Sequence, residues 1–302
     1  MDGERLGGYW LAGQVGAGGQ GVVYEAYDEA ANRVAVKVLH AYLSGDSALR
    51  RRFMQEVSAA QRVASFCTAR IIDHDLKGER PYLVTEFVAG PSLRRAAPFA
   101  GGELHRLAVG VATALAAIHQ AGVEHRDLKP ENVLLGQDGP RVIDFGLARA
   151  AGLSMTSTGE LTGTPMYMAP EVFSGGRADA SADVFAWGAL VYFAATGQDA
   201  FEAPTTVAVF HRLLNHEPDL TMLQPGLRGL VSAALSKDPL RRPSAHGLLT
   251  GLLGGTSQAA LLAEGVQAAT SVRPPDSLAG EPALGLLAEH AYAALHAQAR
   301  ET

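Results

Sequence analysis

The sequence contains a single cysteine, Cys67, among its 302 residues. One thiol excludes a disulfide within the chain and a metal site built from several cysteines. The simplest interpretation is a protein of the reducing cytoplasm in which Cys67 is a small buried apolar residue. The first five residues, Met-Asp-Gly-Glu-Arg, lead into no apolar segment, so we expect no secretory signal there.

Long apolar runs and an excess of basic residues are also missing. The longest apolar stretch, residues 184–195, is too short to span a bilayer and predicts a helix buried on all sides. The formal net charge of −6 argues against a general nucleic-acid-binding protein. The length and the 47% content of hydrophobic residues allow two lobes with sizeable cores.

Two short motifs contain the candidate catalytic and metal-binding residues. Residues 125–132 read His-Arg-Asp-Leu-Lys-Pro-Glu-Asn, and residues 142–146 read Val-Ile-Asp-Phe-Gly. They set Asp127, Asn132 and Asp144 in a fixed order on two short loops. A phosphoryl transferase needs such a set, because one carboxylate orients and deprotonates a hydroxyl while an amide and a second carboxylate hold Mg²⁺ on nucleotide phosphates.

With these motifs the chain resembles the Hanks-type serine/threonine protein kinases, and the sequences of the motifs are most similar to those of the bacterial, actinobacterial branch. The resemblance implies an α+β fold of two lobes, a small β-rich N-lobe with one helix and a larger, mainly helical C-lobe. It implies ATP as the phosphoryl donor, Mg²⁺ or alternatively Mn²⁺ as the metal, and Ser or Thr hydroxyls of proteins as acceptors.

A glycine-rich segment near the N-terminus fits the same family. Gly16, Gly18 and Gly21 follow the pattern Gly-x-Gly-x-x-Gly-x-Val, which lets a strand–turn–strand close over phosphates. Dinucleotide-binding folds use the same spacing but require a helix after the glycines. Here residues 21–27 and 33–39 are rich in β-branched and aromatic residues and predict strands.

Lys37 ends the segment Val-Ala-Val-Lys, which matches the strand that carries the phosphate-binding lysine of kinases. Alternation along this strand puts Lys37 on an otherwise apolar face, where a lysine needs an anionic partner. A surface lysine on an edge strand is the alternative. The resemblance supplies Glu56, on a predicted helix at 47–63, as the partner in an ion pair that marks the active arrangement.

Residues 81–88 predict a strand that runs into a connector at 89–92. The resemblance implies that adenine bonds there to backbone groups of Glu86 and Val88, with Thr85 guarding the pocket behind. It also implies apolar contacts to adenine from Val23, Ala35 and Leu134.

The resemblance assigns supporting roles in the catalytic loop. Lys129 is typical of the serine/threonine branch, and its ammonium would touch the transferred phosphoryl group. Thr164 would bond Asp127 and Lys129, and His125 would pack under Phe145 rather than act as a base.

Two further residue sets belong to the larger lobe. Asp183, at the start of the buried helix, is expected to steady the backbone of the catalytic loop, with a helix N-cap as the alternative role. Glu171, in Ala-Pro-Glu, and Arg242, in residues 237–244, are expected to form a buried structural pair.

Arg126 precedes Asp127, which in this family marks kinases whose activation loop is ordered by its own phosphorylation. Thr156 and Thr158 are the candidate phosphorylation sites, and before phosphorylation Arg126 is expected to lie beside Asp127 without its phosphate partner. The alternative is a polar, solvated loop whose hydroxyl residues reflect only flexibility.

The resemblance covers a kinase domain at 1–253, with the N-lobe at about 9–88 and the C-lobe at about 89–253. Residues 254–302 form an Ala/Leu-rich tail of helical character that either docks on the larger lobe or begins a further domain. Nothing in the sequence predicts an oligomeric state.

Two other functions are alternatives for this sequence. A pseudokinase that acts as a nucleotide-binding scaffold normally lacks Lys37, Asp127, Asn132 or Asp144, and all four are present. A small-molecule phosphotransferase of kindred fold tends to lack the Ala-Pro-Glu segment and the Arg242-type partner, and both are present.

Overall fold

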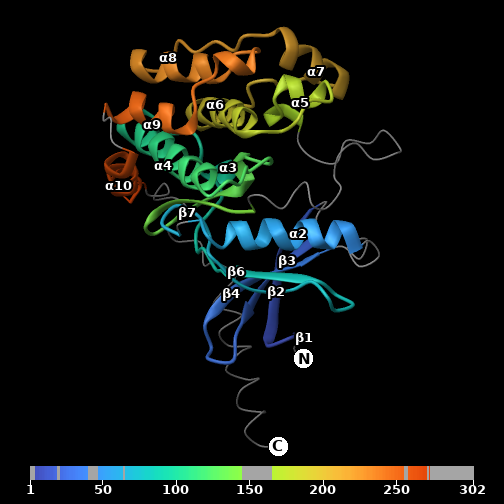
Figure 1. Cartoon of the computed structure of the whole chain (residues 1–302). Coiled ribbons are helices and arrows are strands. Elements are labelled where there is room, and N and C mark those ends of the chain that lie inside the picture. The colour runs from blue at the N-terminus through green and yellow to red at the C-terminus, as the bar shows by residue number, and fades with distance from the viewer. Residues whose placement is uncertain are drawn as a thin grey trace, which may run out of the picture.

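Two lobes of different composition make up the computed structural model (Figure 1). The structure describes residues 4–18, 21–39, 47–63, 65–144, 165–254, 258–270 and 272. The predictions for Phe145, Thr156, Thr158 and Thr164 therefore lie outside the described residues. The predicted α+β fold, with a β-rich smaller lobe and a helical larger lobe, is confirmed.

The smaller lobe is an antiparallel sheet with the strand order β1-β2-β3-β4-β6-β5. Its strands are β1 (Arg5–Leu6), β2 (Tyr9–Gly18), β3 (Gly21–Tyr27), β4 (Arg33–Leu39), β5 (Ile71–Asp75) and β6 (Tyr82–Glu86). Alternation in β4 buries Val34 and Val36 in a cluster with Leu11 and Val84. The helix α2 (Ser47–Ala60) packs Phe53 onto a second cluster.

The register of the central strands sets one face of this sheet. Val23 pairs with Lys37, and Ala35 pairs with Thr85. Because directly opposed residues and residues two apart share a face, these four side chains point to the same side. Lys37 contacts Asp144 at the edge of the larger lobe, so this is the face that looks toward that lobe.

The larger lobe is built from helices around α4 (Gly101–Gln120) and α6 (Ala180–Thr196). The other elements are α3 (Leu93–Ala96), η1 (Pro130–Asn132), η2 (Pro165–Tyr167), α5 (Pro170–Phe173), α7 (Thr206–Asn215), α8 (Pro225–Ala234), η3 (Pro239–Arg241) and α9 (Ala245–Leu253). The predicted burial of α6 is observed, and its Trp187 Nε1 donates to the Ala108 carbonyl of α4 at 3.1 Å.

A short hairpin between the lobes interrupts the helical pattern expected from residue 93 to residue 253. It consists of β7 (Val133–Gly136) and β8 (Gly139–Val142). Isolated bridges join Thr68 to Val142 and Ser92 to Leu134, so the hairpin is held by segments on both sides. Figure 1 shows it between the sheet and the helices.

The first part of the tail docks on the larger lobe. The helix α10 (Gln258–Ala269) packs against α4 and α9, with Leu261 fully buried (Figure 1). The approach is close, because a Cβ at Gly265 would lie 2.1 Å from Thr113 Oγ1. Of the two alternatives for the tail, docking applies to residues 258–269.

The predicted burial of Cys67 is confirmed, and burial raises the pKa of its thiol to about 12. Within the described part of the chain, no helix has the length and apolarity needed to cross a membrane.

Lys237 is a half-buried lysine whose buried ammonium should lower the stability of the larger lobe. Among the described residues this ammonium has no hydrogen-bond partner, and it lies 4.5 Å from the centroid of the Phe201 ring. Desolvation by burial lowers the pKa of Lys237 to about 8 from its ordinary 10.5. The pKa of Lys237 is thus lower in the folded protein than in the unfolded chain. The charged form therefore destabilises the fold by its full amount below pH 8, and this destabilisation fades as the pH rises from about 8 to 10.5.

We expect Lys237→Met to raise the free energy of unfolding by roughly 1 kcal/mol at pH 7, a figure reduced for the partial solvent contact of this side chain. Methionine keeps the contact with the rings and removes the charge. Thermal melts of both proteins at pH 7 and pH 10 measure this increase in stability, which should be smaller at pH 10. The exposed Lys77→Met is the matched control, and an equal gain there would contradict the explanation.

Candidate active site

Asp127 lies at the centre of a small network in the catalytic loop. Lys129 Nζ donates to Asp127 Oδ2 at 2.7 Å, and Asn132 Nδ2 donates to the same oxygen at 3.2 Å and to the Asp127 carbonyl at 2.8 Å. In the described part of the chain no donor bonds Oδ1 of this carboxylate. The Asp127 side chain is 31% exposed.

Asn132 and Asp144 are held side by side. The Ile143 amide donates to the Asn132 carbonyl at 2.9 Å, which aligns the two motif segments. Asp144 has a φ of 61°, an uncommon conformation for a residue with a side chain and one that costs about 1–2 kcal/mol. An amide oxygen and a carboxylate are hard ligands of the kind Mg²⁺ prefers. The pair therefore fits a divalent cation that completes its shell with phosphate oxygens and water.

The predicted ion pair between Lys37 and Glu56 is wrong for this structure. Lys37 Nζ lies 3.0 Å from Asp144 Oδ2, whereas Glu56 Oε1 accepts from Arg126 Nη1 at 2.7 Å. Lys37 is still on the sheet face that the alternation predicts, and it is 8% exposed. Glu56 of α2 thus contacts the catalytic loop instead of β4.

Arg126 is paired with two carboxylates in this structure, and the sequence predicted neither of these contacts. Besides Glu56 it donates from Nη2 to Glu124 Oε2 at 2.8 Å, and its side chain is 15% exposed. Its backbone has a φ of 66°. A guanidinium held by two carboxylates in a partly desolvated position is a charge-assisted contact that a competing anion must displace.

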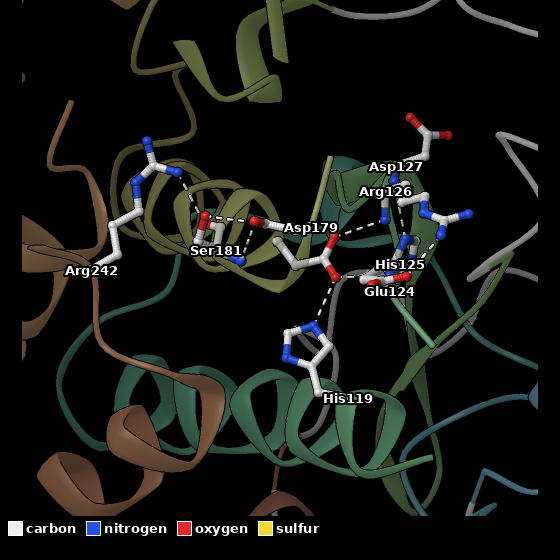
Figure 2. Close-up of polar contacts among 9 residues, drawn as sticks. His119, Glu124, His125, Arg126, Asp127, Asp179, Ser181 and Arg242 are labelled. Carbon is white, nitrogen blue, oxygen red and sulfur yellow. Dashed lines mark hydrogen bonds and ion pairs between the residues drawn. The ribbon is translucent and has the colours of Figure 1, made fainter. Parts of the chain in front are cut away.

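Asp183 fixes the backbone of this loop. Its carboxylate accepts from the amides of His125 and Arg126 at 2.8 and 2.7 Å, and from His119 Nε2 at 2.8 Å. Figure 2 shows these donors converging from α4 and the loop. The alternative role as N-cap belongs to Asp179, whose carboxylate accepts from the Ser181 amide. His119 was not singled out in the sequence, since a lone histidine at a helix end carries no signal.

His125 is fully buried, and burial lowers the pKa of its imidazole. Its Nδ1 accepts from the Asp127 amide at 3.3 Å. A neutral ring that accepts from the backbone supports the loop, which agrees with the structural role expected from the sequence.

The connector after β6 contacts both lobes. Glu86 Oε1 accepts from Arg141 Nη1 at 3.3 Å, and the Arg33 guanidinium lies 3.8 Å from the Phe87 ring. Gly90 has a φ of 155°, and a Cβ there would lie 2.0 Å from the Leu135 carbonyl, so only glycine fits. The residues expected around adenine are half-buried, namely Val23, Ala35, Thr85, Glu86, Val88 and Leu134.

The glycine-rich segment is a hairpin between β2 and β3, with Gly16 opposite Val23 and Gly18 opposite Gly21. A second strand follows the glycines where a dinucleotide site requires a helix, so that alternative is wrong. A Cβ at Gly21 would lie 2.0 Å from the Val38 carbonyl. Glycine at this position therefore lets β3 and β4 approach.

Glu171 and Arg242 form a bidentate pair, with Nη1–Oε1 at 2.6 Å and Nη2–Oε2 at 2.8 Å. The Arg242 side chain has no exposed surface, and it also donates to the carbonyls of Ser181 and Ser236. This planar, bidentate arrangement ties α5 to α6 and to the end of η3.

One cluster near the catalytic loop was missed by the sequence analysis. Arg94 of α3 contacts Glu131 in η1, Tyr167 in η2 and Asp199 in the loop after α6. No local pattern could reveal it, because up to 105 positions separate the partners.

Comparison with known proteins gives a consistent result. The family model described as protein kinase domain matches residues 9–251. The chain is 42% identical over 256 residues to the probable serine/threonine-protein kinase PkwA of Thermomonospora curvata, covering 83% of this chain and 34% of that protein. It is 41% identical over 249 residues to the serine/threonine-protein kinase AfsK of Streptomyces coelicolor, covering 80% and 31%.

Among solved structures, the kinase domain of Mycobacterium tuberculosis PknI superposes with a TM-score of 0.64 at 25% identity, covering 82% of this chain and 96% of that one. The chain spans about a third of the length of PkwA and AfsK.

Proposed function

Since this chain belongs to the protein kinase family, among the bacterial Hanks-type serine/threonine kinases, we propose that it transfers the γ-phosphoryl group of ATP to Ser or Thr hydroxyls of proteins. The observation that carries the proposal is the Asp127 network. Its Oδ2 accepts from Lys129 and Asn132, and we assign Oδ1, which no described residue bonds, to the substrate hydroxyl.

The residues divide the work in the following way. Asp127 orients the attacking hydroxyl and accepts its proton, and Lys129 stabilises the charge that builds up on the transferred group. Lys37 positions the phosphates, and the hairpin glycines cover them. Asp183 keeps the loop in place through the amides of His125 and Arg126.

We assign ATP and Mg²⁺ as the cofactors, with Mn²⁺ as an alternative ion. Asn132 and Asp144 would hold the metal, which neutralises phosphate charge when bound. The half-buried side chains on the β4 face and on β7 would hold the adenine, with the backbone of Glu86 and Val88 at its edge. The proposed location is the cytoplasm. The proposed partners are ATP and protein substrates, and nucleic acid is not proposed as a partner.

The site is less consistent with a nucleotide-binding scaffold that transfers no phosphate than with an active kinase. The lysine, the aspartate base and both metal-binding residues are present and lie within one connected network. Incubation with Mg-ATP and an added protein substrate tests the proposal. Phosphate should appear on Ser or Thr, and its complete absence with correctly folded protein would support the scaffold.

Lys37→Met should fold and lower phosphotransfer by about 100-fold or more, because methionine retains the packing of the stem and lacks the ammonium that holds the phosphates. Glu56→Gln should be milder, because the amide can still accept a hydrogen bond from Lys37 or Arg126 without neutralising the cation. Steady-state kinetics of both variants measures the two effects. A larger loss in Glu56→Gln would reverse the assigned order of roles.

We also propose that phosphorylation at Thr156 or Thr158 raises activity. A phosphate on this segment would compete with Glu56 for Arg126. Release of Glu56 would let α2 move and Glu56 pair with Lys37. Thr156→Ala/Thr158→Ala protein should show several-fold lower activity and less autophosphorylation than wild type. If it phosphorylates an added substrate as fast as wild type, the switch does not reside at these residues.

A further inference from the structure

The larger lobe holds one of its own guanidinium groups in a formed pocket. Arg94 of α3 donates from Nε to Glu131 Oε1 at 2.8 Å, from Nη1 to Asp199 Oδ1 at 2.9 Å and from Nη2 to the Tyr167 hydroxyl at 3.3 Å. The guanidinium carbon also lies 4.2 Å from the Phe193 ring centroid. Two carboxylates, a hydroxyl and an aromatic face are the groups that recognise an arginine side chain.

The pocket is built from the fold rather than from mobile surface groups. Asp199 is 13% exposed, and the buried Tyr167 donates its hydroxyl to the same carboxylate. Burial, together with the bond to Asp199, raises the pKa of Tyr167, so the hydroxyl remains a donor. Glu131, at 42% exposure, forms the solvent edge of the pocket.

The pocket adjoins the catalytic loop. Glu131 follows Asp127 by four residues, and four residues span at most about 14 Å. A substrate peptide whose hydroxyl reaches Asp127 therefore has a side chain within about four positions of the pocket. Tyr167, in η2, forms a second wall of the pocket through its hydroxyl.

We propose that Arg94 determines substrate specificity by filling a subsite for a basic residue. This inference rests on the proposed kinase function and adds a selectivity to it. With Arg94 in place, its one positive charge offsets half of the charge of Glu131 and Asp199, and the guanidinium occupies the space. Wild-type protein then shows no preference for arginine or lysine in the peptide, and loss of Arg94 opens a doubly acidic pocket that selects them.

The test compares wild type, Arg94→Met and the control Arg95→Met on peptides that carry arginine or norleucine at each position around one serine. Methionine keeps the contact with Phe193, and the exposed Arg95 lies next in the same helix. We expect Arg94→Met to favour arginine over norleucine by about tenfold in kcat/KM at one position. Arg95→Met should behave as wild type. Equal selectivity in all three proteins would overturn the proposal.

Two further measurements separate specificity from structure. Millimolar guanidinium chloride should remove the new preference of Arg94→Met by filling the pocket, and adding Glu131→Gln should weaken it. If Arg94→Met fails to fold, Arg94→Gln replaces it with a smaller expected gain.

Binding of labelled peptide by fluorescence anisotropy decides the inference without catalysis. Tighter binding of the arginine peptide to Arg94→Met than to wild type would support the inferred pocket. If none of the proteins transferred phosphate, only the proposed kinase function would be refuted. Unchanged binding in an active kinase would refute only the role of Arg94.

Discussion

Asp127→Asn should lower phosphotransfer by about 100-fold or more while Mg-ATP binding stays near the wild-type value. The amide keeps the shape of the side chain and its bond from Lys129, so the loop should remain folded. It cannot accept the proton of the attacking hydroxyl. Asp127 is not assigned as a ligand of the nucleotide, which is why binding should survive.

Asp144→Asn is the matched comparison, because it makes the same chemical change at the other motif aspartate. It should weaken the metal-dependent part of nucleotide binding, since a neutral amide is a poor ligand for Mg²⁺. It also removes the carboxylate that lies 3.0 Å from Lys37 Nζ. Calorimetric titration with Mg-ATP and a kinase assay of both variants measure the contrast. Near wild-type turnover in Asp127→Asn would show that another group is the base.

Glu171→Ala should destabilise the protein by about 3–5 kcal/mol. The Arg242 side chain has no exposed surface, so removal of its bidentate partner leaves a buried guanidinium uncompensated. For a chain of this size the melting temperature should fall by roughly 10 °C. Thermal melts and denaturant titration measure the effect.

Glu171→Gln retains a hydrogen-bond acceptor and should lose less stability than Glu171→Ala. Glu202→Ala, at an exposed position of the same lobe, is the control and should stay close to wild type. A loss at Glu171→Ala no larger than the loss at Glu202→Ala would mean that the pair contributes nothing to the fold.

Much of the site is readable from the sequence because its chemistry is local. Asp127, Lys129 and Asn132 lie within six consecutive residues, so their mutual contacts follow from one short loop. The face of β4 that carries Lys37 follows from strand alternation. The hairpin β7–β8 had a signal too, since Asp138-Gly139 between apolar residues favours a tight turn.

The ion-pair partner of Glu56 could not be predicted from local sequence. The spacing from Lys37 identifies the helix but not which cation the Glu56 side chain meets, and in the structure that cation is Arg126. Competing ion pairs differ by little free energy, so sequence cannot rank them. The Arg94 pocket and the docking of α10 depend in the same way on long-range packing.

Mapping of phosphorylated residues after incubation of wild-type and Asp127→Asn protein with Mg-ATP tests the central claim most directly. We expect phosphate on Ser or Thr of the wild-type chain and of an added protein substrate, and none in the Asp127→Asn protein. Equal phosphorylation of both proteins, or no phosphorylation by folded wild type, would contradict the assignment of this chain as an active kinase with Asp127 as its base.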